Sequence, residues 1–168
     1  GEGVVKYDGL EFKKISLSDS ITDEFVRSIK VANDGAVWIG LNSGLVAIVT
    51  DSIQRIQINS LASSSIADFT PYGKGGMWVL MQNGGLATIN EKREVLDYSG
   101  FPTLQEFILT DIEATSDENI LLLGTVSGLF TLTINNSQIT SMTEVKGIPE
   151  TKINRIVPRK KGKGEYWI

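Results

Sequence analysis

The chain contains neither cysteine nor histidine among its 168 residues. Without cysteine it can form no disulfide and no thiolate metal site, so bridges give no information on its redox compartment. Zinc sites built on His or Cys, Ser-His-Asp triads and Cys-His dyads are likewise excluded as arrangements internal to the chain. Our expectation for the chain is no catalytic residues, no bound metal and no cofactor.

Long apolar runs and excess positive charge are also missing. The composition, 41% hydrophobic and 21% charged, is that of an ordinary globular chain, and no apolar run approaches the length of about 20 residues that spans a bilayer. We expect no membrane insertion of this segment. The formal net charge of −4 argues against nucleic-acid partners, because affinity for phosphates comes from Lys and Arg.

A block of about 42 residues recurs along the chain, with an aromatic strand followed by a Gly-hydrophobic turn. The glycine of this turn recurs at steps of 41, 41 and 43 residues, at Gly3, Gly44, Gly85 and Gly128. The aromatic position recurs at Trp38, Trp78, Leu122 and Trp167. Self-similarity at this period indicates a stacked or radial repeat architecture.

Each block can be divided into four short strands. In the best-preserved block, Asp34-Gly35 lies between two apolar runs, which is typical of a tight hairpin. The four strands expected there are 25–31, 37–40, 45–49 and 53–58. Such units match the blades of an all-β propeller with four-stranded antiparallel sheets. A β-sandwich also has short strands, but it does not predict a turn that returns at nearly constant spacing.

The chain would hold about three full blades and two half blades. Two strands at the start, 4–7 and 10–15, correspond to the end of a blade, and two at the end, 153–157 and 166–168, begin another. The expected division is 1–24, 25–64, 65–107, 108–151 and 152–168. The half blades could close a small ring or be the cut edges of a larger one, and we favour a fragment, since the last strand stops before its expected turn.

The repeat resembles the two-component regulator propeller repeat, with the pattern V-x-x-I-x-x-D-x-D-G-x-h-W-h-G-T-x-x-G-L, where h is hydrophobic. Residues 26–40 with Gly44-Leu45 follow it closely, and residues 3–12 are similar to the ending GL-x-x-Y-D-G-x-x-F. The similarity covers nearly the whole chain but weakens after the first block. Leu80 replaces the glycine after the second tryptophan, and Leu122 replaces the third tryptophan.

This resemblance implies a seven-bladed propeller in the periplasmic or extracellular part of a bacterial signalling protein of the two-component type. It implies a non-enzymatic sensor that recognises a glycan or another small-molecule ligand, with further blades of the same protein as neighbours. Similar propellers serve secretion and cell-surface complexes, so a structural or protein-interaction role is the alternative. A propeller lyase or glycosidase is a third, and it would need convergent acid, base or metal residues.

The first strand of a propeller blade lines the central channel, so the residue before its second apolar position deserves notice. At this position the four repeats have Ser28, Asp68, Asp111 and Arg155. If these side chains face the axis, two carboxylates and a guanidinium would converge where a cation or polar ligand could bind. A hydrated polar channel and, with two carboxylates, acid-base catalysis are the other interpretations.

Overall fold

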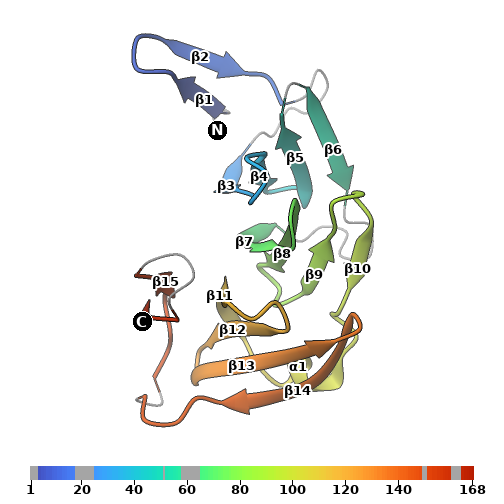
Figure 1. Ribbon diagram of the computed structural model, residues 1–168, viewed down its shortest axis with the longest axis vertical. Helices are drawn as coiled ribbons and strands as arrows, with labels where there is room; N and C mark the ends of the chain where they lie inside the picture. The colour runs from blue at the N-terminus through green and yellow to red at the C-terminus, as the bar shows by residue number, and fades with distance from the viewer. Residues whose placement is uncertain (1–3, 18–24, 51, 58–64, 149–150, 160–163) are drawn as a thin grey trace.

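The computed structural model describes residues 4–17, 25–50, 52–57, 65–148, 151–159 and 164–168. These residues form antiparallel sheets that follow one another around an arc (Figure 1). The three four-stranded sheets contain β3 (Val26–Val31), β4 (Val37–Leu41), β5 (Leu45–Val49) and β6 (Ile53–Gln57); β7 (Ile66–Tyr72), β8 (Gly76–Met81), β9 (Leu86–Ile89) and β10 (Val95–Asp97); and β11 (Leu109–Ala114), β12 (Ile120–Thr125), β13 (Gly128–Asn135) and β14 (Gln138–Glu144).

A two-stranded sheet lies at each end of the arc (Figure 1). The first pairs β1 (Val4–Tyr7) with β2 (Phe12–Ile15), and the last pairs β15 (Val157–Pro158) with β16 (Tyr166–Trp167). The prediction of four-stranded antiparallel units in an all-β fold is confirmed. In each four-stranded sheet the first strand lies on the concave side of the arc and the fourth on the convex side (Figure 1).

Most predicted strand boundaries in the best-preserved block agree with the structure to within one residue. The first glycine of the repeated turn, Gly3, and the expected strand end, Ile58, lie outside the described residues. The prediction of a strand over 153–157 was wrong, because only its last residue enters β15. The Ile156 N–H, for example, donates to the side-chain Oδ2 of Asp111 rather than to a neighbouring strand.

A short helix, α1 (Pro102–Gln105), was missed by the sequence analysis. It lies in the connection between β10 and β11, where Pro102 occupies the first helical turn, a position at which the absence of an N–H is harmless. Leu104 is its buried residue and packs beside Tyr98 in the core around β8 and β12. Four residues are too few for the 3.6-residue periodicity that identifies a helix in a sequence.

The hydrophobic cores lie between consecutive sheets. Trp38, Val46 and Ile48 of the first four-stranded sheet pack with Phe69 and Val79 of the second. A second core joins the β7–β10 sheet to the β11–β14 sheet, and two smaller ones join the terminal two-stranded sheets to their neighbours. Each central sheet is therefore buried on both faces, which explains why the second strands read as nearly continuous apolar runs.

The glycine after the aromatic position allows two sheets to approach. A Cβ at Gly40 would lie 2.4 Å from Cγ2 of Ile66 and 2.9 Å from Cε2 of Phe69, both in the next sheet. A Cβ at Gly124 would lie 3.0 Å from Cγ2 of Ile153. In the second repeat, Leu80 fills this position and is fully buried in the core shared with β11 and β12. The contact between the β7–β10 and β11–β14 sheets therefore contains a leucine side chain where the other two contacts have a glycine.

Both ends of the arc expose apolar side chains. Ile29 is 51% exposed, whereas Phe69 and Ile112, at the same position of the next two sheets, are fully buried against the sheet before them. At the other end, Trp167 is 68% exposed, while Trp38 at the same repeat position is fully buried. The burial of these repeat positions therefore depends on a neighbouring sheet that covers them.

Candidate functional site

A β-bulge recurs in the first strand of each four-stranded sheet. The register with the second strand shifts between Val26 and Ser28 in β3, and the same shift occurs in β7 and β11, immediately before Asp68 and Asp111. In a regular strand, residues three apart point to opposite faces. The extra residue of the bulge places the two apolar side chains of each first strand on one face, as with Ile66 and Phe69.

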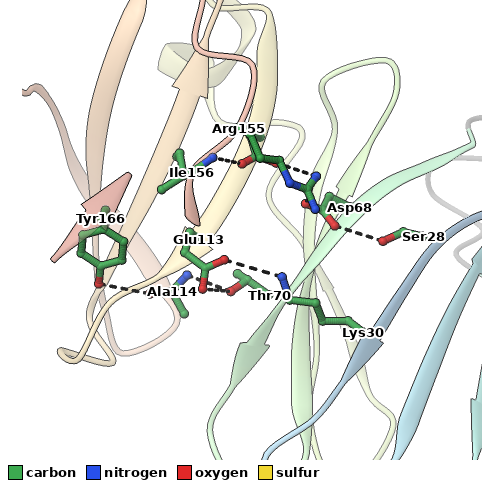
Figure 2. A network of polar contacts seen from close by, with 10 residues as sticks. Ser28, Lys30, Asp68, Thr70, Glu113, Ala114, Arg155, Ile156 and Tyr166 are labelled. Atoms are coloured by element: carbon green, nitrogen blue, oxygen red, sulfur yellow. Dashed lines mark hydrogen bonds and ion pairs between the residues drawn. The ribbon is translucent and has the colours of Figure 1, made fainter. Parts of the chain in front are cut away.

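The three bulged strands and the segment before β15 bring together the four residues that the sequence singled out (Figure 2). The Ser28 hydroxyl donates to Oδ1 of Asp68 at 3.0 Å. Nη1 of Arg155 lies 2.9 Å from Oδ2 of Asp68 and 3.2 Å from Oδ1 of Asp111. The two carboxylates come from neighbouring sheets and are almost completely buried, with residue exposures of 4% and 1%. The four residues thus form one continuous polar network.

Arg155 reaches past the neighbouring sheet to make this contact. It precedes β15, passes Asp111 of the adjacent sheet and also contacts Asp68 of the sheet beyond. The backbone assists, because the Ile156 N–H donates to Oδ2 of Asp111 at 2.6 Å and the Thr110 hydroxyl donates to the Ile153 carbonyl at 2.5 Å. With the Ser28 contact to Asp68, the network therefore ties four successive parts of the arc together.

A second polar layer lies two residues further along the same strands, and the sequence analysis missed it. Lys30 of β3 lies 3.6 Å from Oε2 of Glu113 in β11, again passing the sheet between them. The Thr70 hydroxyl of β7 donates to Oε1 of Glu113 at 3.3 Å and accepts from the Ala114 N–H at 2.8 Å (Figure 2). The sequence did contain a signal for this layer. Its residues each follow Ser28, Asp68 or Asp111 by two positions, and residues two apart in a strand point to the same face.

Burial dominates the electrostatics of both layers. Desolvation raises the pKa of Asp111 to about 7, helped by the Asp68 carboxylate and opposed by the Ile156 N–H and the Arg155 guanidinium. Desolvation also raises the pKa of Glu113, and Lys30 and Thr70 oppose that rise. Near neutral pH the network therefore holds a carboxyl group that exchanges its proton with small changes in pH.

The raised pKa of Asp111 predicts that stability falls as the pH rises from about 4 to 7. Folded Asp111 keeps its proton up to about pH 7, whereas the unfolded chain releases it near its ordinary pKa of 3.8. The folded state binds more protons in this window, so each pH unit costs at most about 1.4 kcal/mol. Denaturant unfolding at several pH values measures this slope, and Glu113 contributes in the same direction.

Asp111→Asn isolates the Asp111 contribution to this slope. The amide is neutral throughout, and its oxygen can still accept from the Ile156 N–H, so the decline between pH 4 and 7 should flatten. Asp117→Asn, in the exposed β11–β12 turn, is the matched control and should leave the slope unchanged. A slope that persists in Asp111→Asn would show that the proton resides elsewhere.

The comparisons with known proteins concern the fold. No family model matches the chain, and no curated protein matches it. Catalytically inactive virginiamycin B lyase from Staphylococcus aureus, solved with quinupristin, is 15% identical with a TM-score of 0.67 over 88% of this chain. The fold is a β-propeller. Three full blades and two half blades are present in the described residues, and the chain spans 49% of the lyase.

The extracellular domains of two proteins from B. thetaiotaomicron are also similar in fold. The extracellular domain of a protein assigned to the one-component systems is 16% identical, with a TM-score of 0.65 over 86% of this chain and 19% of its own. The extracellular domain of a protein assigned to the hybrid two-component systems is 15% identical, with a TM-score of 0.60 over 88% of this chain and 20% of its own. At these identities the similarity extends to the fold alone.

Proposed function

We propose that this propeller segment belongs to an extracytoplasmic sensor of a bacterial signalling protein, where it recognises a ligand without catalysis. The repeat resembles the two-component regulator propeller repeat, and the similarity in fold to the extracellular domains of a hybrid two-component system and a one-component system supports this assignment. Further blades of the same protein would cover the exposed apolar ends at Ile29 and Trp167. A seven-bladed ring is the arrangement that the resemblance implies.

The observation that carries the proposal is the polar network of the inner strands. The framework positions of the repeat recur, whereas the position of Ser28, Asp68, Asp111 and Arg155 holds three different residue types in four repeats. A propeller scaffold does not specify a function, so specificity must come from such differing positions. Here they supply a buried carboxylate pair and an exposed guanidinium close to the concave side of the arc.

Recognition without catalysis agrees with the chemistry of the network. Both Asp68 and Asp111 contact Nη1 of Arg155, and Oδ2 of Asp111 also accepts the Ile156 N–H. A glycosidase needs two carboxyl groups that flank the scissile bond and reach the substrate. These two side chains, at 5% and 1% exposure, are instead covered and fixed by protein groups.

Thermal unfolding of the chain in a panel of neutral and acidic oligosaccharides tests the sensor function. A ligand present at about 100 times its dissociation constant stabilises by about 2.7 kcal/mol, which corresponds to a rise of about 5–10 °C in Tm. No rise across the panel, together with a stable protein partner in a pull-down, would favour the structural role in a secretion or cell-surface complex. Chemical turnover of a panel member would identify an enzyme.

A further inference from the structure

A groove of about 410 Å³ adjoins the inner-strand network at Arg155. Residues 151–155 form most of its wall, and Ile148 and Ile168 complete it. The wall combines the cationic side chains of Lys152 and Arg155 with the polar side chains of Thr151 and Asn154 and with apolar isoleucines. Among its described lining residues there is no Asp or Glu, so the groove offers positive charge next to an apolar surface.

The Arg155 side chain is held in place by two buried carboxylates. Both of its carboxylate contacts, to Asp68 at 2.9 Å and to Asp111 at 3.2 Å, use the same nitrogen, Nη1. Among the contacts within the described residues, none engages Nη2 or Nε, and the side chain is 58% exposed. Anchoring has already restricted the rotamers of the side chain, so a ligand would lose less entropy in ordering it.

The open edge of the guanidinium is suited to an anion with two oxygens. Nε and Nη2 carry N–H donors that are spaced for the oxygens of one carboxylate, and such two-point, charge-assisted hydrogen bonds are among the strong ones. Lys152 adds a second positive charge on the same wall. Ile148 and Ile168, which are not fully buried, provide the apolar surface that an organic ligand would cover.

We propose that this groove binds a small organic carboxylate, with its oxygens on Arg155 and its apolar part against the isoleucines. The inference rests on the proposed recognition function and names a chemical class for its ligand. Asp68 and Asp111 lie behind Nη1 and do not cancel the attraction. Because the pKa of Asp111 is raised to about 7, the pair carries fewer than two negative charges at neutral pH, against the two positive charges of Arg155 and Lys152.

Calorimetric titration of the chain with benzoate and hexanoate tests the proposal. We expect dissociation constants of about 1 mM, the affinity of a ligand of nine atoms or so that contributes about 0.4–0.5 kcal/mol per atom. Benzamide and hexanamide have the same shape without the charge. They should bind at least about tenfold more weakly, because charge-assisted hydrogen bonds are roughly twice as strong as neutral ones.

Three variants locate the binding. Arg155→Gln should weaken the binding of benzoate at least about tenfold, and Lys152→Gln, which removes the point charge alone, about threefold. Lys74→Gln lowers the net charge equally but lies in the β7–β8 turn, and should leave binding unchanged. If Arg155→Gln does not fold, Lys152→Gln decides the question, since no carboxylate of the network contacts Lys152 in the described residues.

The proposal is wrong if the amides bind as tightly as the acids, if neither Arg155→Gln nor Lys152→Gln weakens binding, or if neither acid binds at about 10 mM, ten times the expected dissociation constant. The recognition function has a separate readout. A neutral oligosaccharide that raises Tm while both acids fail to bind would reject the carboxylate site and retain the sensor. Absence of both responses would reject both.

Discussion

Replacing Trp38 by alanine is expected to lower the free energy of unfolding by about 3–5 kcal/mol, the usual cost of removing a large buried aromatic side chain. Trp38 is fully buried between two blades. Its ring meets Phe69 edge-on, with the ring centroids 6.2 Å apart, and the Arg93 guanidinium lies 5.2 Å from its centroid. Truncation therefore removes apolar burial, an aromatic pair and a cation–π contact at once.

The repeat itself supplies the control for this prediction. Trp167 occupies the same repeat position as Trp38 but is 68% exposed. Trp167→Ala should therefore change the stability of this chain by no more than about 0.5 kcal/mol, as expected at an exposed site. Trp38→Phe, which keeps an aromatic ring in the core, should cost less than Trp38→Ala. Urea unfolding of the three variants and the parent chain gives the free energies and shows whether the slopes are alike.

Equal losses for Trp38→Ala and Trp167→Ala would contradict the packing described above. Such a result would mean that stability comes from the aromatic strand itself and not from blade-to-blade contact. The expected inequality follows from the architecture, because each central sheet is buried on both faces and each terminal one is partly exposed. In repeat proteins the interfaces between neighbouring units contribute much of the stability.

The spacing of repeated residues was sufficient to predict the fold class. The steps between glycines and between aromatic positions identified four-stranded units, and the structure has them. The apolar pairs three residues apart, such as Ile66 and Phe69, also contained the signal for the recurring bulge, since a regular strand would place them on opposite faces.

The candidate site was only partly predictable. The sequence singled out Ser28, Asp68, Asp111 and Arg155 because they hold equivalent positions in successive repeats, and the structure brings them into contact. Whether they line a channel and bind a ligand stays a prediction. The layer of Lys30 and Glu113 escaped notice because its two charges lie 83 positions apart in the sequence and on non-adjacent sheets. Only the curvature of the arc brings them together.

Gly40→Ala is expected to lower the free energy of unfolding by about 1–3 kcal/mol through overpacking. The added Cβ would lie 2.4 Å from Cγ2 and 2.6 Å from Cβ of Ile66, and 2.9 Å from the Phe69 ring. The Ile66 Cβ is attached directly to the β7 backbone, and both side chains are fully buried, so no rotamer change relieves the overlap. The two sheets would have to separate.

Two other glycines make this a graded series. A Cβ at Gly124 would lie 3.0 Å from Cγ2 and 3.2 Å from Cβ of Ile153, further than the corresponding contacts at Gly40, so Gly124→Ala should cost less than Gly40→Ala. A Cβ at Gly100 would meet nothing within 4 Å, and Gly100→Ala should change stability by less than about 1 kcal/mol. If all three substitutions had the same effect in urea unfolding, close approach of the sheets could not be the reason for glycine at position 40. The expected order would instead show that Gly40 is needed for the close packing of neighbouring blades. This glycine would then belong to the framework of the repeat, and recognition would depend on the inner-strand positions.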